Sequence, residues 1–263
     1  MARWWRGHLR WAIAGVLVVV LVAAVIVAWP LVQRYTGAAP PAQFYEKVEL
    51  DPALAGDYPR VLGVAHNAGN NLGTLAAALR SGADVIEIDV ISARGQLAAG
   101  RDHWPSWLAG QVFRGPTLVQ AWDHAAAASI VKLDLQRNDR GLLNDLVTFL
   151  DQRAGSRRVM ISSRDASALL YLHRRLPGVT LLFSVAGPDA VHQLQSDSAL
   201  RQAIGGVSVF QGLVDANLVT WVHQHKLLIL AWTVNDGQRL NQLVRLHVDG
   251  ITTANLAILR ALG

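Results

Sequence analysis

The sequence contains no cysteine. This absence excludes disulfide bonds, thiolate metal sites and thiol nucleophiles, so a catalytic site has to be built from other side chains. Charged residues are scarce, at 16% of the chain, and the net charge of +5 is not gathered into a basic stripe, so nothing indicates nucleic-acid binding. The sequence also lacks a glycine-rich phosphate loop after its first predicted strand and a repeat of solenoid length, which argues against dinucleotide-binding and solenoid folds.

Apolar residues are abundant, at 52% of the chain, and one long run of them lies near the N-terminus. From Trp11 to Trp29 no residue is charged. At about 1.5 Å per residue this run spans roughly 28 Å as a helix, close to the thickness of the bilayer hydrocarbon. Three arginines precede the run and tryptophans stand at both of its ends, which is typical of a membrane-spanning helix with a cytoplasmic N-terminus.

These features predict four parts of the chain. They are a cytoplasmic basic N-terminus (1–10), a single-pass transmembrane signal anchor in the cell membrane (11–32), a linker (33–58) and a barrel domain outside the cytoplasm (59–263). The stretch GAAPPA at residues 37–42 is typical of a stiff linker. Its small residues also leave open a cleaved signal peptide, although the apolar run exceeds the roughly 7–15 residues usual for one.

From Arg60 onward, short β-branched runs alternate with segments of helical periodicity. The predicted strands are Val61–His66, Asp84–Val90, Ser129–Leu135, Arg158–Ser162, Thr180–Val185, Gly206–Phe210, Leu227–Thr233 and Gly250–Thr252. The predicted helices include Leu75–Arg80, Leu118–Ala127, Gly141–Arg153 and Ala166–Arg175. Such alternation indicates parallel strands with crossover helices, and eight strands close a TIM barrel. We predict an α/β fold, a TIM (β/α)8 barrel, with a Rossmann-like open sheet as the alternative.

One further short run, Gln96–Ala99, follows the second strand after only Ala93-Arg94-Gly95. A connection this short joins antiparallel strands, because a parallel pair needs a long crossover. The run is therefore predicted to form a β-hairpin at the barrel rim.

Polar residues collect where the predicted strands end. His66 ends the first strand, and Glu87 and Asp89 lie two residues apart on the second, so their carboxylates share one face. A third carboxylate, Asp134, lies on the next parallel strand. TIM barrels build their active sites at these strand ends, and neighbouring carboxylates resist burial unless a cation neutralises them. We predict that Glu87, Asp89 and Asp134 bind one hard divalent cation, Mg²⁺ or Ca²⁺.

The alternative is a structural network in which the carboxylates pair with Lys132 and with arginines. Lys132 and Gln136 lie two residues before and after Asp134, so all three face the same way. The recurrence of polar residues at three strand ends favours a functional site over a purely structural network.

Three segments give the sequence a family resemblance. They are Gly82–Asp89 (GADVIEID), Ala231–Asn235 (AWTVN) and Asp249–Thr252 (DGIT), and they occur in order within residues 60–263. The sequence resembles the glycerophosphodiester phosphodiesterase family, within the phospholipase-C-like TIM-barrel phosphodiesterases. An aspartate at position 134 and an asparagine after the first histidine, Asn67, also resemble sphingomyelinase-D-like relatives.

The resemblance implies hydrolysis of a phosphodiester by one metal ion and two histidines that act as acid and base. His66 matches the first histidine, and Glu87 and Asp89 match the family's metal-binding E-x-D pair. Asp134 falls on the carboxylate of the third strand, and Trp232 matches the aromatic residue that lines the substrate pocket.

The sequence departs from the family pattern at the metal and phosphate positions. Asn67 replaces the arginine that follows the first histidine, and Gln136 replaces a lysine. The family's Glu-Asn-Thr reads Leu72-Gly73-Thr74 here, so only Asn70 or Asn71 offers a nearby neutral ligand.

A second departure concerns proton transfer. Arg101 occupies the position of the second catalytic histidine, and His103 lies two residues later. Arginine binds phosphate well but does not give up its proton, so it cannot replace a general acid. Two alternatives follow: His103 transfers the second proton, or Arg101 clamps the phosphate while water protonates the leaving group.

Together these observations predict a membrane-anchored, metal-dependent phosphodiesterase that acts on glycerophosphodiesters or phospholipid headgroups. The alternative is a degenerate barrel that binds a phosphorylated or lipid ligand without turnover. The predicted site residues are His66, His103 and Arg101 for catalysis, Glu87, Asp89 and Asp134 for the metal, and Trp232, Lys132, Gln136 and Asn67 for the substrate.

Overall fold

The computed structural model describes residues 60–101, 113–153, 155 and 157–263. The strands in these ranges are β1 (Leu62–Ala65), β2 (Val85–Ala93), β3 (Gln96–Ala99), β4 (Ile130–Leu135), β5 (Arg158–Ser163), β6 (Thr180–Val185), β7 (Gly206–Phe210), β8 (Leu228–Trp232) and β9 (Gly250–Thr253). The helices are α2 (Leu72–Arg80), α4 (Leu118–His124), α5 (Arg140–Asp151), α6 (Ala166–His173), α7 (Pro188–Ser196), α8 (Ser198–Ala203), α9 (Ala216–Gln224), α10 (Gly237–Arg245) and α11 (Leu256–Leu262). Two short 3-10 turns, η2 (Ala68–Asn70) and η4 (Gln211–Leu213), follow β1 and β7.

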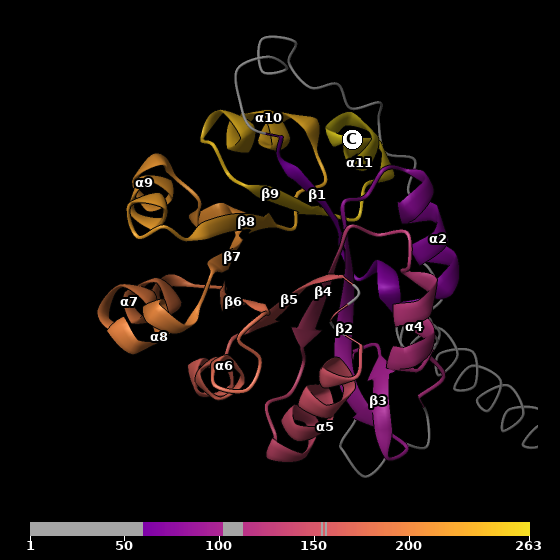
Figure 1. The fold of residues 1–263 in the computed structure, drawn as a ribbon. Coiled ribbons are helices and arrows are strands. Elements are labelled where there is room, and N and C mark those ends of the chain that lie inside the picture. The colour runs from indigo at the N-terminus through magenta and orange to yellow at the C-terminus, as the bar shows by residue number, and fades with distance from the viewer. Residues whose placement is uncertain (1–59, 102–112, 154, 156) are drawn as a thin grey trace, which may run out of the picture.

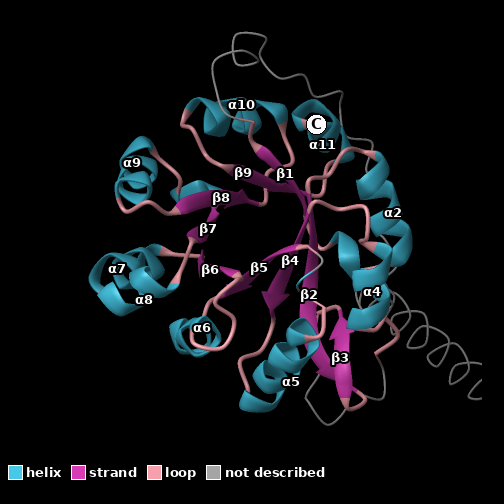
Figure 2. Ribbon diagram, in the orientation of Figure 1, coloured by secondary structure: helices cyan, strands magenta, loops and turns pink. Residues whose placement is uncertain are grey.

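The strands form a closed barrel. They pair in the order β1-β9-β8-β7-β6-β5-β4-β2-β3, and β1 also pairs with β2. β3 pairs antiparallel with β2, and the other eight strands pair in parallel. Figures 1 and 2 show the strands at the centre and the helices in a ring around them. The predicted barrel and its rim hairpin are both confirmed.

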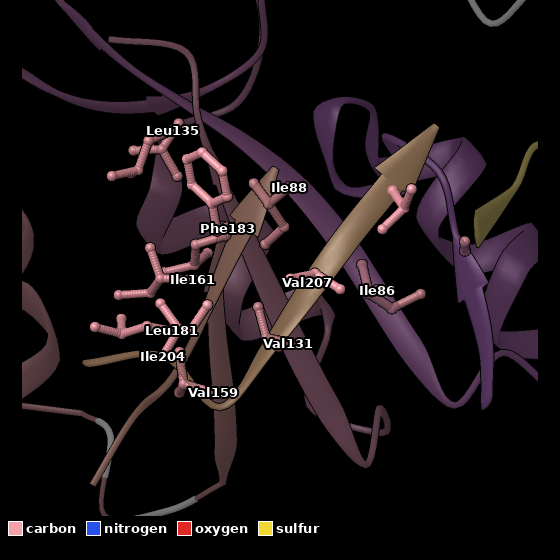
Figure 3. Packing of buried hydrophobic residues seen from close by; sticks show 14 of the residues in the cluster. Ile86, Ile88, Val131, Leu135, Val159, Ile161, Leu181, Phe183, Ile204 and Val207 are labelled. Carbon is pink, nitrogen blue, oxygen red and sulfur yellow. The ribbon is translucent and has the colours of Figure 1, made fainter. Parts of the chain in front are cut away.

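Side chains on each strand alternate between the barrel interior and the helix-covered exterior. The outward positions carry large apolar residues that are fully buried under the helices, and Figure 3 shows Ile88, Ile161 and Phe183 among them. On the inward face, a separate apolar cluster plugs the barrel and consists of Val64, Val85, Ile130, Met160, Leu182 and Leu230. The inward residues that follow this cluster along β2 and β4 are charged, so a polar layer lies above an apolar floor.

Capping side chains determine where α2 and α4 begin, and the apolar pattern of the sequence does not reveal them. The Asn71 side chain accepts hydrogen bonds from the backbone N–H groups of Gly73 and Thr74, which starts α2 at Leu72 rather than at the predicted Leu75. Thr117 and Gln120 form a capping box at the start of α4. These caps set where each helix begins above the barrel.

Within residues 60–101, 113–153 and 157–263, no helix is long and apolar enough to cross a bilayer. The predicted anchor (11–32), its flanking segments (1–10 and 33–58) and His103 all lie outside the described residues.

Candidate active site

The three predicted metal-binding carboxylates meet inside the barrel. Glu87 and Asp89 project from β2, and Asp134 projects from the adjacent β4 at the position directly paired with Asp89. One oxygen from each carboxylate lies within 4.8 Å of the others. Glu87 and Asp89 are buried and Asp134 is half-buried. The barrel thus concentrates three acidic groups in a space from which water is largely excluded.

Lys132 is the cation nearest to Glu87. Its Nζ lies 3.3 Å from Glu87 Oε2, and both side chains are buried. Burial alone would lower the pKa of Lys132, but the carboxylates of Glu87 and Asp134 raise it, so the ammonium stays charged. Burial raises the pKa of Glu87 even though Lys132 opposes the shift. Apart from its 3.3 Å ion pair with Lys132, Glu87 Oε2 has no partner among the described residues, so this oxygen is able to take another ligand.

Asp89 lies at the centre of a hydrogen-bond network. Asn70 Nδ2 donates to Asp89 Oδ2 at 2.7 Å, and Gln136 Nε2 donates to Asp89 Oδ1 at 3.0 Å. Arg101 Nε donates to Asp89 Oδ2 at 2.9 Å in an ion pair. Despite these donors, burial raises the pKa of Asp89 to about 6, assisted by the charges of Glu87 and Asp134. Negative charge at the cluster is therefore incompletely compensated.

Asp134 is held by neutral donors. Gln136 Nε2 donates to its Oδ2 at 2.6 Å, and the Ser162 hydroxyl on β5 donates to its Oδ1. Gln136 therefore bridges Asp89 and Asp134, at a position where the family pattern has a lysine. An amide in this position orients the two carboxylates without neutralising them.

His66 follows β1 and faces Arg101. Arg101 Nη2 lies 3.4 Å from His66 Nε2. Burial lowers the pKa of His66 to about 4, and the positive charge of Arg101 adds to the effect. The imidazole is consequently neutral at physiological pH, which is the state that can accept a proton.

Asn67 lies between His66 and the carboxylates. Its backbone is left-handed, with φ of 55°, which asparagine tolerates better than most residues. With its amide nitrogen toward Asp89, Asn67 donates to both carboxylate oxygens at 3.0 and 3.1 Å, and its amide oxygen accepts from Arg101 Nη2 at 2.8 Å. Asn67 thus ties Arg101 to Asp89, where the family pattern would place an arginine.

Gly69 explains how the turn after β1 approaches β2 so closely. A Cβ atom at this position would lie 2.3 Å from Ile88 Cγ1, so a larger residue would push the η2 turn away from the strand. The close approach lets Asn70 bond Asp89 twice, because the Asp89 backbone N–H also donates to Asn70 Oδ1 at 2.9 Å. Asn70 therefore holds the carboxylate in place in this structure.

A cavity of about 530 Å³ opens above these groups. Its lining includes the predicted residues His66, Glu87, Arg101, Lys132, Asp134, Gln136 and Trp232. Arg137, Arg164, Ser163, Ser184 and Ser208 also line it. The serines were not predicted, although Ser184 and Ser208 lie at inward positions of β6 and β7, where the period-two pattern could have found them. Ser163 is the last residue of β5 and has the outward parity of that strand. The six histidines in helical segments, His124, His173, His192, His223, His225 and His247, are exposed and away from this cavity.

The part of the chain that carries most of the barrel is similar to a known family. Residues 119–257 match the model of the glycerophosphoryl diester phosphodiesterase family. No curated protein sequence matches the chain.

Several solved structures share the fold. A phosphodiesterase from Oleispira antarctica in complex with the product sn-glycerol-3-phosphate is 17% identical, with a TM-score of 0.62 over 80% of this chain and 98% of that one. A glycerophosphodiester phosphodiesterase from Agrobacterium tumefaciens is 15% identical, with a TM-score of 0.63 over 77% and 98% of the two chains. Another from Parabacteroides distasonis is 18% identical, with a TM-score of 0.61 over 75% and 94%. At these identities the likeness establishes the barrel fold alone.

Proposed function

The chain belongs to the glycerophosphoryl diester phosphodiesterase family, and from this premise we propose that it hydrolyses glycerophosphodiesters at the cavity above the carboxylate cluster. As a member of the family it is a phosphoric diester hydrolase. The observation that carries the finer proposal is the convergence of a neutral His66, three carboxylates and Arg101 on one cavity. Complex formation between the Oleispira antarctica relative and sn-glycerol-3-phosphate supports the choice of a glycerol-containing substrate.

We propose a divalent cation, Mg²⁺ or Ca²⁺, as the cofactor. Carboxylate oxygens are the ligands that both ions prefer, and Glu87, Asp89 and Asp134 would hold it. The three carboxylates carry three negative charges, whereas Lys132 and Arg101 supply two positive ones, which leaves one negative charge uncompensated. Glu87 Oε2 is buried and accepts no hydrogen bond from the part of the chain that the structure describes, which also suits a metal ligand. When bound, the cation would supply polarisation of a phosphoryl oxygen.

The side chains of the chain itself supply the remaining functions. His66 accepts a proton from the attacking water, because its imidazole is neutral and lines the cavity. Arg101 is exposed to the cavity on one side and can bind the phosphate through its remaining N–H groups. The leaving alkoxide requires a proton that arginine cannot give, and His103 is our candidate for that donor. Trp232 offers an aromatic face to the alcohol, and Lys132 and Gln136 contribute polar contacts around the phosphate. Asn67, predicted as a substrate-binding residue, does not line the cavity and acts through Arg101 and Asp89.

The second candidate is a barrel that binds a phosphorylated or lipid ligand without turnover. The ion pair of Arg101 with Asp89 favours it, since this arginine occupies the position of the family's second histidine. An assay for hydrolysis separates the two functions.

Chelation of divalent cations should abolish hydrolysis. We expect the purified protein to release glycerol phosphate from glycerophosphodiesters with Mg²⁺ or Ca²⁺ and to lose this activity in EDTA, with recovery when the cation is restored. Calorimetry should show cation binding to the wild type, no binding to Asp134→Asn, and unchanged binding to Asp145→Asn, an exposed control on α5. Ligand binding without turnover of any diester would instead support the second candidate.

We also propose that residues 11–32 anchor the protein in the membrane, with the barrel outside the cytoplasm. The long uncharged run, its arginine-rich N-terminal flank and its terminal tryptophans support this proposal. Full-length protein should stay in the membrane pellet after alkaline carbonate washing, whereas a variant that begins at residue 33 should not. Release of the full-length protein by carbonate would contradict the anchor.

A further inference from the structure

The guanidinium of Arg101 lies against a carboxylate that the proposed cation also needs. Its Nε donates to Asp89 Oδ2 at 2.9 Å. Its Nη2 donates to the amide oxygen of Asn67 at 2.8 Å when the Asn67 amide nitrogen faces Asp89. Both contacts therefore hold Arg101 at the edge of the carboxylate cluster.

The carboxylate of Asp89 is saturated with hydrogen-bond donors. Its Oδ2 accepts from Arg101, Asn70 and Asn67. Its Oδ1 accepts from Gln136 and Asn67. A carboxylate offers about four lone-pair positions, so these donors leave none for a metal ion. A cation that binds Asp89 therefore has to take the place of a donor.

Charge determines which donor leaves. Asn67, Asn70 and Gln136 donate through neutral amides, whereas Arg101 carries a positive charge that repels a cation. Repulsion between like charges is strong in a buried site, because little water screens it. Asp89 is fully buried, but the side chain of Arg101 is 42% exposed and can turn toward the cavity. Arg101 is thus the donor that a cation would replace.

The backbone beside Arg101 gives this movement a fixed base. The Gly100 N–H donates to the backbone carbonyl of Asp89 at 2.8 Å, directly after the β3 ladder ends at Ala99. Arg101 lines the cavity, and its Nη1 has no hydrogen-bond partner in the described part of the chain. The guanidinium therefore stays within reach of the cavity when it leaves Asp89, with N–H groups that an anion can accept.

The charges of the cluster match a divalent cation only when Arg101 has moved. With Arg101 and Lys132 in contact, the three carboxylates keep one uncompensated negative charge. With Lys132 alone they keep two, which is the charge that a divalent cation neutralises. The released guanidinium carries one positive charge, which matches the single negative charge of a phosphodiester. One movement of Arg101 therefore prepares the cation site and the phosphate site together.

We infer that Arg101 couples the binding of a divalent cation to the binding of phosphate. The guanidinium remains on Asp89 until both ligands are present, so each ligand raises the affinity for the other, and linkage makes the two effects equal. The family pattern has a histidine at this position, so the coupling is a consequence of the arginine in this chain. The inference rests on the proposed function, because it takes a divalent cation and a phosphate ester as the ligands of the cavity.

The test measures Mg²⁺ binding by calorimetry on the full-length protein in detergent, with and without inorganic phosphate. Arg101→Gln and Arg101→Met remove the guanidinium. Arg164→Gln is the matched control, because Arg164 is exposed and lines the same cavity but does not contact Asp89.

In the wild type, phosphate should raise the affinity for Mg²⁺ on the order of tenfold, a usual size for coupling between two sites. Without phosphate, both Arg101 variants should bind Mg²⁺ about tenfold more tightly than the wild type, because no guanidinium competes for Asp89. Phosphate should then raise their affinity by a smaller factor. Arg164→Gln should bind Mg²⁺ as the wild type does. A gain in affinity cannot come from loss of the fold, so it reports on the site itself.

The coupling is overturned if the Arg101 variants bind Mg²⁺ no more tightly than the wild type. An equal gain in Arg164→Gln would also overturn it, since general charge repulsion would then explain the result. Hydrolysis of a glycerophosphodiester by the wild type is measured separately. Coupled binding without hydrolysis refutes the proposed function and keeps the coupling, whereas hydrolysis with uncoupled binding refutes the coupling and keeps the proposed function.

Discussion

Replacement of His66 by alanine should lower kcat for a glycerophosphodiester by about 10²–10⁴-fold, the usual contribution of a positioned general base. His66 lines the cavity beside Arg101, and burial keeps its imidazole unprotonated. Steady-state kinetics of the variant measure the effect. His173→Ala provides a control, because His173 is exposed at the end of α6 and does not line the cavity.

The pH profile gives the same prediction a second readout. The pKa of His66 falls from 6.5 to about 4, mainly through burial and then through the charge of Arg101. Because the free imidazole is the active form, protonation of His66 should limit activity only near pH 4. The profile is measured with saturating cation, which keeps Asp89, whose pKa is about 6 without it, in its ionised form. An acid limb at 6.5, or a fully active His66→Ala variant, would show that another group accepts the proton.

Replacement of Lys132 by methionine should destabilise the protein by about 3–5 kcal/mol, the typical cost of removing one partner of a buried ion pair. Lys132 and Glu87 are both buried and lie 3.3 Å apart, so the variant leaves Glu87 charged in the barrel interior without its nearest cation. Urea denaturation followed by circular dichroism measures the change in the free energy of unfolding.

The double variant Glu87→Gln/Lys132→Met is the matched control. It removes both charges, so most of the lost stability should return. If the single variant is as stable as the wild type, the Glu87 carboxylate is already neutral or is compensated by another cation. Rescue of Lys132→Met by Mg²⁺ or Ca²⁺ would identify that cation as the proposed metal.

The barrel could be predicted from the sequence because its signals are local. Alternating strands and helices, and the short connection Ala93-Arg94-Gly95, specify parallel crossovers and one hairpin regardless of the rest of the chain. Predicted and observed strand ends differ by three residues or fewer, and Thr180–Val185 and Gly206–Phe210 agree fully. The convergence of Glu87, Asp89 and Asp134 follows from the same periodicity, since Asp89 and Asp134 are register partners.

The contacts around these carboxylates were not predictable in the same way. Asn67 reaches Asp89 only because its backbone is left-handed and because Gly69 lets the turn pack against Ile88. Both features depend on the distance between two segments about 20 residues apart in the chain, which no local pattern records. Ser184 and Ser208 lie at inward strand positions that the period-two pattern identifies, but a serine at such a position does not by itself indicate a site.

The pairing of β1 with β9 determines when the active site can form during synthesis of the chain. Leu62 pairs with Gly250 and Ala65 with Thr253, so the strand that leads into His66 is flanked on one side by residues that leave the ribosome long after it. Until those residues emerge, β1 has only β2 as a neighbour and the wall beside His66 is open. Contacts of such high sequence separation form late and slowly. The nascent chain therefore carries nearly all of its site residues long before they can act together, and hydrolysis begins only after β9 has been made and has paired with β1.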